Sequence, residues 1–218
     1  MLLQIAIDRP ESLGIVRQVA DLADIIEVGT PVLKRFGLAA ISTCRELAPE
    51  VPVLADTKTV DGGAEEAEMI FNAGAMFMTV LSSAAPATRQ AVSDVAGKYG
   101  AHVVVDTLTE HGDLSEATLA YPPHFDVVCV HVPTDARLAG DMALSDRLKW
   151  VAKLHELGYR VSLAGGVDRS NLASIISVGP EIVIVGSGIT ASKDPRGITE
   201  WIVSQLPQRG LGWPWEAQ

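Results

Sequence analysis

The sequence is poor in cysteine and in aromatic residues, and it has no apolar run long enough to cross a membrane. Only two of its 218 residues are cysteine, and Cys44 and Cys129 lie too far apart for a disulfide framework or a zinc motif. We expect both to be small core residues in a reducing cytoplasm. The N-terminal segment MLLQIAID lacks the basic region and long apolar stretch of a signal peptide. These absences predict a soluble, cytoplasmic protein with no membrane partner.

Positive charge is also scarce in this sequence. There are 17 Lys and Arg residues against 27 Asp and Glu residues, which gives a formal net charge of −10 at pH 7. This charge repels the nucleic-acid backbone, so we expect no nucleic-acid partner. It repels smaller anions as well, and a phosphorylated ligand would therefore need a local site of backbone N–H groups.

The abundant residues are typical of an α/β protein. Apolar residues make up 48% of the sequence and aromatic residues only 5%, so Val, Ile, Leu and Ala must build the core. Such a core surrounds a buried parallel sheet, and a chain of this length has room for one large core. Residues 209–218 are interpreted as a C-terminal tail, in which Trp213 and Trp215 pack against a neighbouring surface.

Short apolar runs alternate with helix-like segments along the chain. Eight such strand-and-helix units predict a single-domain (β/α)8 (TIM) barrel over residues 1–208. The doubly wound alternative would carry a glycine-rich fingerprint after its first strand, and none is present. The predicted strands span residues 2–7, 24–28, 51–56, 76–81, 102–106, 126–131, 160–166 and 181–186. The predicted helices span residues 11–22, 32–47, 64–72, 86–99, 114–119, 142–157, 170–177 and 199–206.

Reactive side chains gather at one end of the predicted strands. In barrel enzymes the carboxyl ends of the strands form the active-site face. In chain order these ends hold Asp8, Glu27, Asp56 with Lys58, Thr79, Asp106, His131, Gly165 with Gly166, and Gly186 with Ser187. We interpret as solvated rim residues the groups at the opposite ends, which are Asp24, His102, Asp126, Arg160 and Glu181.

The segment LADTKTVDGG, residues 54–63, carries the densest group of charges. Asp56 and Lys58 share one side of an extended chain because side chains alternate along a strand. The following glycines permit an abrupt turn into the next helix. In isolation this D-x-K-x-x-D motif, which ends at Asp61, would indicate a solvated ion pair at a turn. The reactive groups at the other strand ends favour a catalytic role instead.

Three further groups are candidates for chemistry. Glu27 and Asp56 supply the carboxylate oxygens that Mg²⁺ prefers. The alternative is that Glu27 forms an ion pair with Lys58 and binds no metal. His131 follows four apolar residues at the expected barrel mouth, where a histidine is either structural or a general acid or base. Barrels often bind phosphate after the seventh and eighth strands, where this sequence has Gly165, Gly166, Gly186 and Ser187.

Five segments resemble the orotidine-monophosphate-decarboxylase suprafamily, and the resemblance extends over essentially the whole chain. They are IIEVGTP (25–31), the D-x-K-x-x-D motif, VHVPTDARLAG (130–140), LAGG (163–166) and IVIVGSGIT (182–190). The sequence is most similar to the magnesium-dependent branch, which comprises 3-hexulose-6-phosphate synthase and 3-keto-L-gulonate-6-phosphate decarboxylase. Glu27 stands where orotidine decarboxylase has a lysine, and a carboxylate there suits a metal site.

Three positions separate the two activities of that branch. The decarboxylase pattern has glutamate, arginine and threonine where this sequence has Asp106, Thr134 and Ala164, so the resemblance favours the synthase. The synthases tend to read H-T-G-x-D-x-Q after the sixth strand, whereas this sequence has Pro133 and Arg137 there. The loop 107–113 differs as well. These departures border the expected substrate pocket and bear on the identity of the second substrate.

The resemblance implies an aldol addition of formaldehyde to D-ribulose 5-phosphate through a Mg²⁺-stabilised enediolate, which gives 3-hexulose 6-phosphate. It implies that His131 is the base and that Lys58, oriented by Asp8, hydrogen-bonds the developing oxyanion. Asp106 would position formaldehyde or hydroxyl groups. Asp61 would reach into the partner's site, so the resemblance implies a homodimer with shared active sites. The implied substrate- and phosphate-binding residues are Ala164, Gly165, Gly166, Gly186 and Ser187.

Three other functions stay open at this stage. A related decarboxylase would share the enediolate and differ in the group that leaves or enters. A phosphopentose epimerase is also a barrel enzyme, but that function would not explain the D-x-K-x-x-D motif. A non-catalytic phosphosugar-binding dimer would keep the glycine turns and would not need Lys58 or His131.

Overall fold

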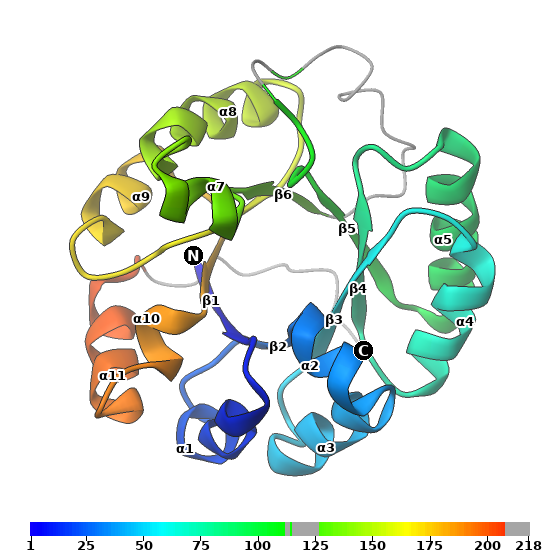
Figure 1. The fold of residues 1–218 in the computed structure, drawn as a ribbon, viewed down its shortest axis with the longest axis horizontal. Coiled ribbons are helices and arrows are strands. Elements are labelled where there is room, and N and C mark those ends of the chain that lie inside the picture. The colour runs from blue at the N-terminus through cyan, green and yellow to red at the C-terminus, as the bar shows by residue number, and fades with distance from the viewer. Residues whose placement is uncertain (112–113, 115–126, 208–218) are drawn as a thin grey trace.

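In the computed structural model, eight parallel strands form a closed barrel in which each strand pairs with the next and β8 pairs with β1. Figure 1 shows the strands as an inner ring with the helices around it. The predicted (β/α)8 barrel is confirmed. The structure describes residues 1–111, 114 and 127–207. The predicted helix 114–119, apart from Leu114, and the predicted tail 209–218 lie outside the described residues.

The strands are rich in β-branched residues and lie close to their predicted positions. Their bounds are β1 (Leu2–Ile7), β2 (Ile25–Val28), β3 (Val53–Thr59), β4 (Phe77–Leu81), β5 (His102–Asp106), β6 (Val127–His131), β7 (Val161–Ala164) and β8 (Ile182–Val185). The exception is β3, which continues past the predicted end at Asp56 to Thr59. This extension carries Lys58 as part of the strand.

Two predicted helices are divided in the structure. The segment 11–22 begins with the 3-10 helix η1 (Pro10–Ile15) and continues as the short α1 (Val16–Val19). The segment 32–47 is split into α2 (Thr30–Phe36) and α3 (Ala39–Leu47), because Gly37 adopts a positive φ of 63° that ends the first helix.

The other predicted helices are present, and two short ones were not predicted. The predicted ones are α4 (Gly63–Asn72), α5 (Pro86–Tyr99), α8 (Leu144–Glu156), α9 (Leu172–Val178) and α11 (Pro195–Gln205). The additional ones are α7 (Thr134–Ala139) and α10 (Ser187–Thr190), which are too short to show helical periodicity in the sequence. No helix among the described residues is long and apolar enough to cross a membrane.

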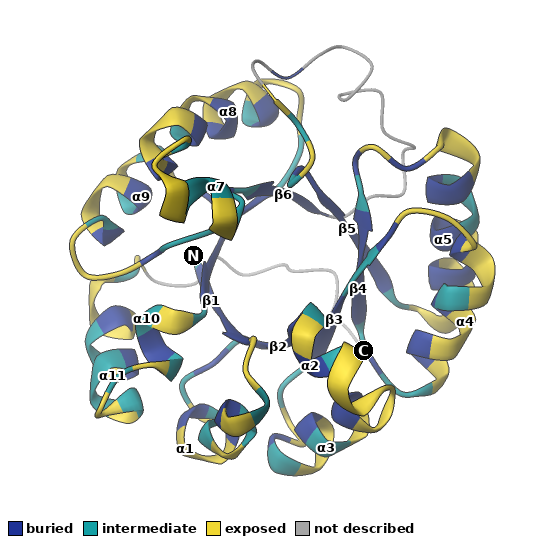
Figure 2. Ribbon diagram, in the orientation of Figure 1, coloured by how far each residue is buried: buried dark blue, intermediate teal, exposed yellow. Residues whose placement is uncertain are grey.

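The apolar core has two parts, one inside the barrel and one between the barrel and its helices. Figure 2 shows the strands buried along their length, while the helices are buried mainly on the side facing them. Cys129 lies in the inner part, and Cys44 lies in the outer part. Both cysteines are buried and free, as predicted. The inner part comprises Leu2, Ala6, Ile25, Leu54, Phe77, Val104, Val127, Cys129, Ala164, Ile182 and Ile184.

The interpretation of the amino-terminal strand ends as solvated is wrong for His102. Its side chain is buried and stacks on Phe77, with ring centroids 5.2 Å apart. Asp24 and Glu181 are partly buried and accept backbone hydrogen bonds from Leu3 and Val161, each at 2.7 Å. These carboxylates therefore satisfy strand N–H groups that would otherwise lack a partner.

Candidate active site

The polar residues at the carboxyl ends of the strands converge on the mouth of the barrel. Asp56 and Asp106 lie two positions beyond Leu54 and Val104 of the inner core, so alternation along each strand points them inward. The predicted residues that lie within contact or electrostatic range of one another are Asp8, Glu27, Asp56, Lys58, Asp106 and His131. Their chemical roles remain predictions.

Lys58 owes its position to an irregularity at the end of β3. Among the described residues, Lys58 is the single non-glycine residue with a positive φ, which is 51°. The register of β3 against β4 also shifts between Ala55 and Thr59. Such a bulge re-aims a side chain at the end of a strand. Lys58 Nζ consequently lies 2.5 Å from Asp56 Oδ2 and 3.6 Å from Asp106 Oδ2.

The carboxylates that hold Lys58 differ from the expected ones. The resemblance implied that Asp8 orients this lysine, but within ion-pair distance the structure places Asp56 and Asp106 instead. The alternative pairing of Lys58 with Glu27 does not occur either. Burial opposes the positive charge, but the two neighbouring carboxylates outweigh it and raise the pKa of Lys58. The ammonium is therefore charged at neutral pH.

Asp56 is oriented by two threonines to which the sequence assigned no role. Thr79 Oγ1 donates to Asp56 Oδ1 at 3.0 Å, and the Thr30 hydroxyl lies 2.7 Å from the Asp56 carbonyl oxygen and 2.9 Å from Asp56 Oδ2, between which it shares its hydrogen. The Lys58 backbone N–H also donates to Thr79 Oγ1, at 2.9 Å, so one hydroxyl links the carboxylate to the strained residue. The sequence identifies Thr79 as a polar residue at the end of a strand, whereas nothing in the sequence singles out Thr30 except that it follows Gly29.

Glu27 is buried, and Gln4 Nε2 donates a 2.6 Å hydrogen bond to its Oε2. Burial raises the pKa of Glu27 well above its usual range, and the carboxylates of Asp56 and Asp8 raise it further. Asp8 lies exposed at the mouth, where the surrounding protein and Asp56 raise its pKa as well. A polar Gln4 inside the apolar run LLQIAI was the available sequence signal for this contact.

These carboxylates fit a hard divalent cation. The carboxylates of Asp8, Glu27 and Asp56 all lie within electrostatic range of the single ammonium of Lys58, so acidic groups outnumber the basic group here. Oxygen ligands from one or two carboxylates, with further positions left for water and substrate, are typical of Mg²⁺ sites. Glu27 and Asp56 are thus chemically suited to the predicted metal.

His131 and Asp106 form a hydrogen-bonded pair at the opposite side of the mouth. His131 Nδ1 lies 3.0 Å from Asp106 Oδ2, and the Leu108 backbone N–H donates to Asp106 Oδ1 at 2.8 Å. Burial alone would raise the pKa of Asp106, but His131 and Lys58 outweigh it and lower that pKa. The ionised Asp106 therefore accepts a hydrogen bond from the Nδ1–H group of His131, and this leaves Nε2 of the neutral ring as the nitrogen that can accept a proton.

Cys129 completes a three-residue cluster with this pair. Potential ligand atoms of Asp106, Cys129 and His131 all lie within 4.8 Å of one another. Burial raises the pKa of the Cys129 thiol well above its usual range, and Asp106 raises it further. A protonated thiol is a poor metal ligand, and the Asp106 carboxylate is already bonded to His131. The cluster therefore suits proton transfer at His131 better than metal binding.

The predicted phosphate-binding glycines form tight turns after β7 and β8. Gly165 and Gly166 have positive φ values of 103° and 78°, which favour glycine. A Cβ at Gly186 would lie 2.8 Å from Asp8 Oδ2. Asn171 Nδ2 donates to the Gly166 carbonyl at 2.8 Å and fixes the first turn. The backbone at both turns can therefore approach a ligand closely.

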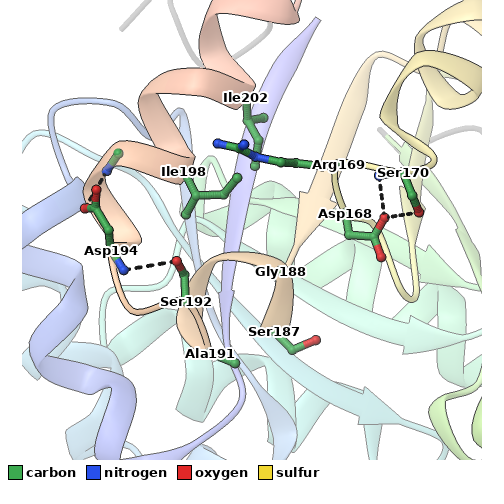
Figure 3. A pocket seen from close by; sticks show the side chains of 11 residues that line it. Asp168, Arg169, Ser170, Ser187, Gly188, Ala191, Ser192, Asp194, Ile198 and Ile202 are labelled. Carbon is green, nitrogen blue, oxygen red and sulfur yellow. Dashed lines mark hydrogen bonds between the residues drawn. The ribbon is translucent and has the colours of Figure 1, made fainter.

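A cavity of about 710 Å³ lies beside these turns (Figure 3). It shares Ser187 with the predicted phosphate-binding residues, but it is not lined by the charged residues of the barrel mouth. Asp168 is bound to Ser170, and Asp194 accepts the Gly197 N–H at the start of α11. The cavity thus borders the phosphate side of the site and is separate from Lys58 and His131.

Asp61 is not part of this group within one subunit. It is exposed in the turn between β3 and α4, and no hydrogen bond or ion pair joins it to another residue in the described part of the chain. Its predicted role in a partner's site is untested by a single subunit. Val60 beside it is 53% exposed, which is high for an apolar residue adjoining a buried strand.

Comparison with known proteins identifies the family of this barrel. The sequence model of the Orotidine 5'-phosphate decarboxylase / HUMPS family matches residues 1–201. The chain belongs to that family. Within the family, the 3-hexulose-6-phosphate synthase of Methylomonas aminofaciens is 33% identical over 190 residues, which cover 87% of this chain and 90% of that protein. The protein of the same name from Bacillus subtilis (strain 168) is 32% identical over 199 residues, which cover 89% and 93%.

Solved structures of the Orotidine 5'-phosphate decarboxylase / HUMPS type superpose on the whole barrel. The 3-hexulose-6-phosphate synthase of Salmonella typhimurium has a TM-score of 0.85 and 35% identity, and the match covers 94% of this chain and 97% of that one. KGPDC from Streptococcus mutans has the same TM-score with 28% identity, covering 94% and 98%. The predicted resemblance to this suprafamily is confirmed.

Proposed function

We propose that the protein is a 3-hexulose-6-phosphate synthase, an aldehyde-lyase that adds formaldehyde to D-ribulose 5-phosphate. The observation that carries the proposal is the arrangement of His131 on Asp106 opposite the carboxylates Glu27 and Asp56, with the charged Lys58 between them. A proton acceptor, a cation and a set of oxygen ligands at one barrel mouth suit the formation of an enediolate. The similarity to named synthases supports this choice of reaction.

In the proposed reaction, His131, Asp106 and Lys58 have different roles. His131 takes the proton from carbon 1 of the ketose at its free Nε2, while Asp106 holds the ring and stabilises the imidazolium. The electron pair left on the substrate forms a new bond to the formaldehyde carbon. The formaldehyde oxygen then takes up the proton, so the product contains every atom of both substrates. Lys58 donates a hydrogen bond to the oxyanion that develops at carbon 2.

Glu27 and Asp56 would hold Mg²⁺, with Gln4, Thr30 and Thr79 fixing their orientation. When bound, this cation supplies positive charge that stabilises negative charge on substrate oxygens. Exhaustive chelation should therefore abolish activity, and added Mg²⁺ should restore it. Activity that survives chelation would overturn this assignment.

We also propose a cytoplasmic homodimer in which Asp61 completes the partner's site. The proposal is supported by the exposed position of Asp61 at the end of the extended β3 and by the apolar Val60 beside it. The phosphorylated ketose would bind with its phosphate at Ala164 to Gly166 and at Gly186 and Ser187, where glycine lets the backbone of two tight turns approach an anion closely. Its reacting end would then face His131 and Lys58.

The decisive experiment supplies ribulose 5-phosphate and formaldehyde to the purified protein with Mg²⁺. We expect equimolar consumption of both and formation of a hexulose 6-phosphate. A second assay follows exchange of the carbon-1 proton with deuterated water when formaldehyde is omitted. Release of CO2 from 3-keto-L-gulonate 6-phosphate without formaldehyde consumption would identify a decarboxylase. Exchange without formaldehyde consumption would indicate a different acceptor.

A further inference from the structure

Arg137 lies directly against the first glycine turn of the proposed phosphate site. It belongs to α7, which follows β6 and His131. A Cβ at Gly166 would lie 2.7 Å from Arg137 Cδ and 2.8 Å from Arg137 Nε, so glycine is needed for the guanidinium to occupy this place. A Cβ at Gly165 would likewise lie 2.9 Å from the Val132 backbone N. The segment from Val132 to Arg137 therefore packs onto the turn through both glycines.

The guanidinium of Arg137 has an unmet hydrogen-bonding requirement. Its Nε is buried and has no hydrogen-bond partner among the residues that the structure describes. A buried donor without a partner costs free energy, and more so when the donor belongs to a charged group. Arg147 also has one buried nitrogen without a partner, Nη1, but its other two guanidinium nitrogens donate to the Glu110 carbonyl and to Met142. The Arg137 Nε is thus positioned for a partner that the described residues do not supply.

The neighbouring acidic residue does not serve as that partner. Asp168 follows the glycine turn, and hydrogen bonds from Ser170 chiefly lower its pKa, with Arg137 a weaker cause. Asp168 Oδ1 accepts from both the backbone N–H and the hydroxyl of Ser170, at 2.8 and 2.6 Å. No ion pair joins Asp168 to Arg137 in the described part of the chain. The positive charge is therefore available to an anion at the turn.

We propose that Arg137 is a specificity-determining residue that binds the phosphate group of the ketose substrate at the Gly165–Gly166 turn. A guanidinium presents planar N–H donors that match phosphate oxygens, and such charge-assisted bonds are stronger than bonds from neutral backbone groups alone. The net charge of −10 repels anions, and a single positive group at the turn offsets this locally. The assignment rests on the proposed function for the identity of the ligand and on the geometry for its location.

The test measures binding, so that it does not depend on turnover. Titration calorimetry with ribulose 5-phosphate and, separately, with inorganic phosphate compares the wild type with Arg137→Gln and Arg137→Lys. We expect Arg137→Gln to weaken both ligands by about 10- to 100-fold, the range for a hydrogen bond to a charged group. Arg137→Lys should recover part of the loss because it restores the charge without the planar donors. Arg196→Gln, which removes an exposed arginine paired with Asp21, is the matched control and should change neither affinity.

The outcomes separate this assignment from the proposed reaction. Loss of phosphate affinity in Arg137→Gln supports the role of Arg137 even if formaldehyde is not consumed. Equal phosphate affinity in wild type and folded Arg137→Gln overturns it, even if the synthase activity is present. In steady-state assays the KM for ribulose 5-phosphate should rise while kcat and the KM for formaldehyde stay nearly unchanged. Should the variants not fold, phosphate must protect Arg137 of the wild type from phenylglyoxal, and absence of protection overturns the role.

Discussion

Gln4 Nε2 donates a 2.6 Å hydrogen bond to Oε2 of Glu27 inside the barrel, which links a residue of β1 to the proposed metal ligand of β2. Both side chains are buried, so water does not replace the amide if it is removed. We expect Gln4→Leu to lower the affinity for Mg²⁺ by about 10- to 100-fold, the usual effect of removing a residue that orients a metal ligand. Calorimetric titration with Mg²⁺ measures this directly. Gln90→Leu removes the amide that bonds Asp94 on α5 and should leave the affinity unchanged.

The second prediction concerns His131 as the base. His131→Asn keeps a polar side chain and removes the proton acceptor, so turnover should fall by about 10²- to 10⁴-fold, the usual contribution of general-base catalysis. Exchange of the carbon-1 proton should fall in parallel, while the affinity for ribulose 5-phosphate persists. The control is His155→Asn, at a histidine that bonds Glu181 at the other end of the barrel. A loss confined to substrate affinity would assign His131 to binding.

The third prediction follows from the lowered pKa of Asp106. Because the folded state holds this carboxyl ionised below its ordinary value of 3.8, the unfolded state binds more protons near that pH. The contribution of Asp106 to the free energy of unfolding is therefore present above pH 3.8 and is lost as the pH falls through the folded-state pKa. Asp106→Asn should reduce the free energy of unfolding by a larger amount at pH 7 than at pH 3. Urea unfolding at both pH values provides the measurement, with exposed Asp141→Asn as control. An equal loss at both pH values would contradict the ionic role.

The fourth prediction concerns sites shared between subunits. Asp61→Ala and Lys58→Ala homodimers should each be inactive. If Asp61 serves the partner's site, a mixed dimer contains one intact site and one doubly altered site. Equal amounts reassociated at random should regain about a quarter of wild-type activity, because half of the dimers are mixed and each has one working site of two. No recovery in demonstrably mixed dimers would place Asp61 in the site of its own subunit, and a stable, active monomer would refute the dimer.

The barrel was predictable because its strands are separate apolar runs, each followed by a helix-like segment. The gathering of Asp56, Asp106 and Glu27 at one end of the barrel followed from their places at the carboxyl ends of those strands. The polar contacts between strands were harder to predict, because Gln4 and Thr30 meet their partners only after the barrel closes. Side-chain contacts between neighbouring strands depend on the register of those strands, which cannot be predicted from a local pattern of residues.

The predictions that differ from the structure failed for reasons that can be traced to single residues. The segment 32–47 kept helical spacing through Gly37, whose positive φ divides it. His102 was interpreted as solvated because it is polar and begins a strand, yet it stacks on Phe77 inside the barrel. The pairing of Lys58 with Asp56 agrees with their spacing, but its approach to Asp106 could not be derived from the sequence, since the shift in register at the end of β3 decides where the ammonium points.

The backbone of Lys58 also bears on how the sequence can change. A non-glycine residue in the left-handed region costs roughly 1–2 kcal/mol, a cost that glycine would avoid. Glycine at this position would relieve that strain, but it would also leave the buried carboxylates of Asp56 and Asp106 without their cation, which costs more than the strain. Random variants selected only for thermal resistance should therefore retain lysine at position 58, as should those selected for turnover. Stability and activity thus both keep lysine in a backbone conformation that favours glycine.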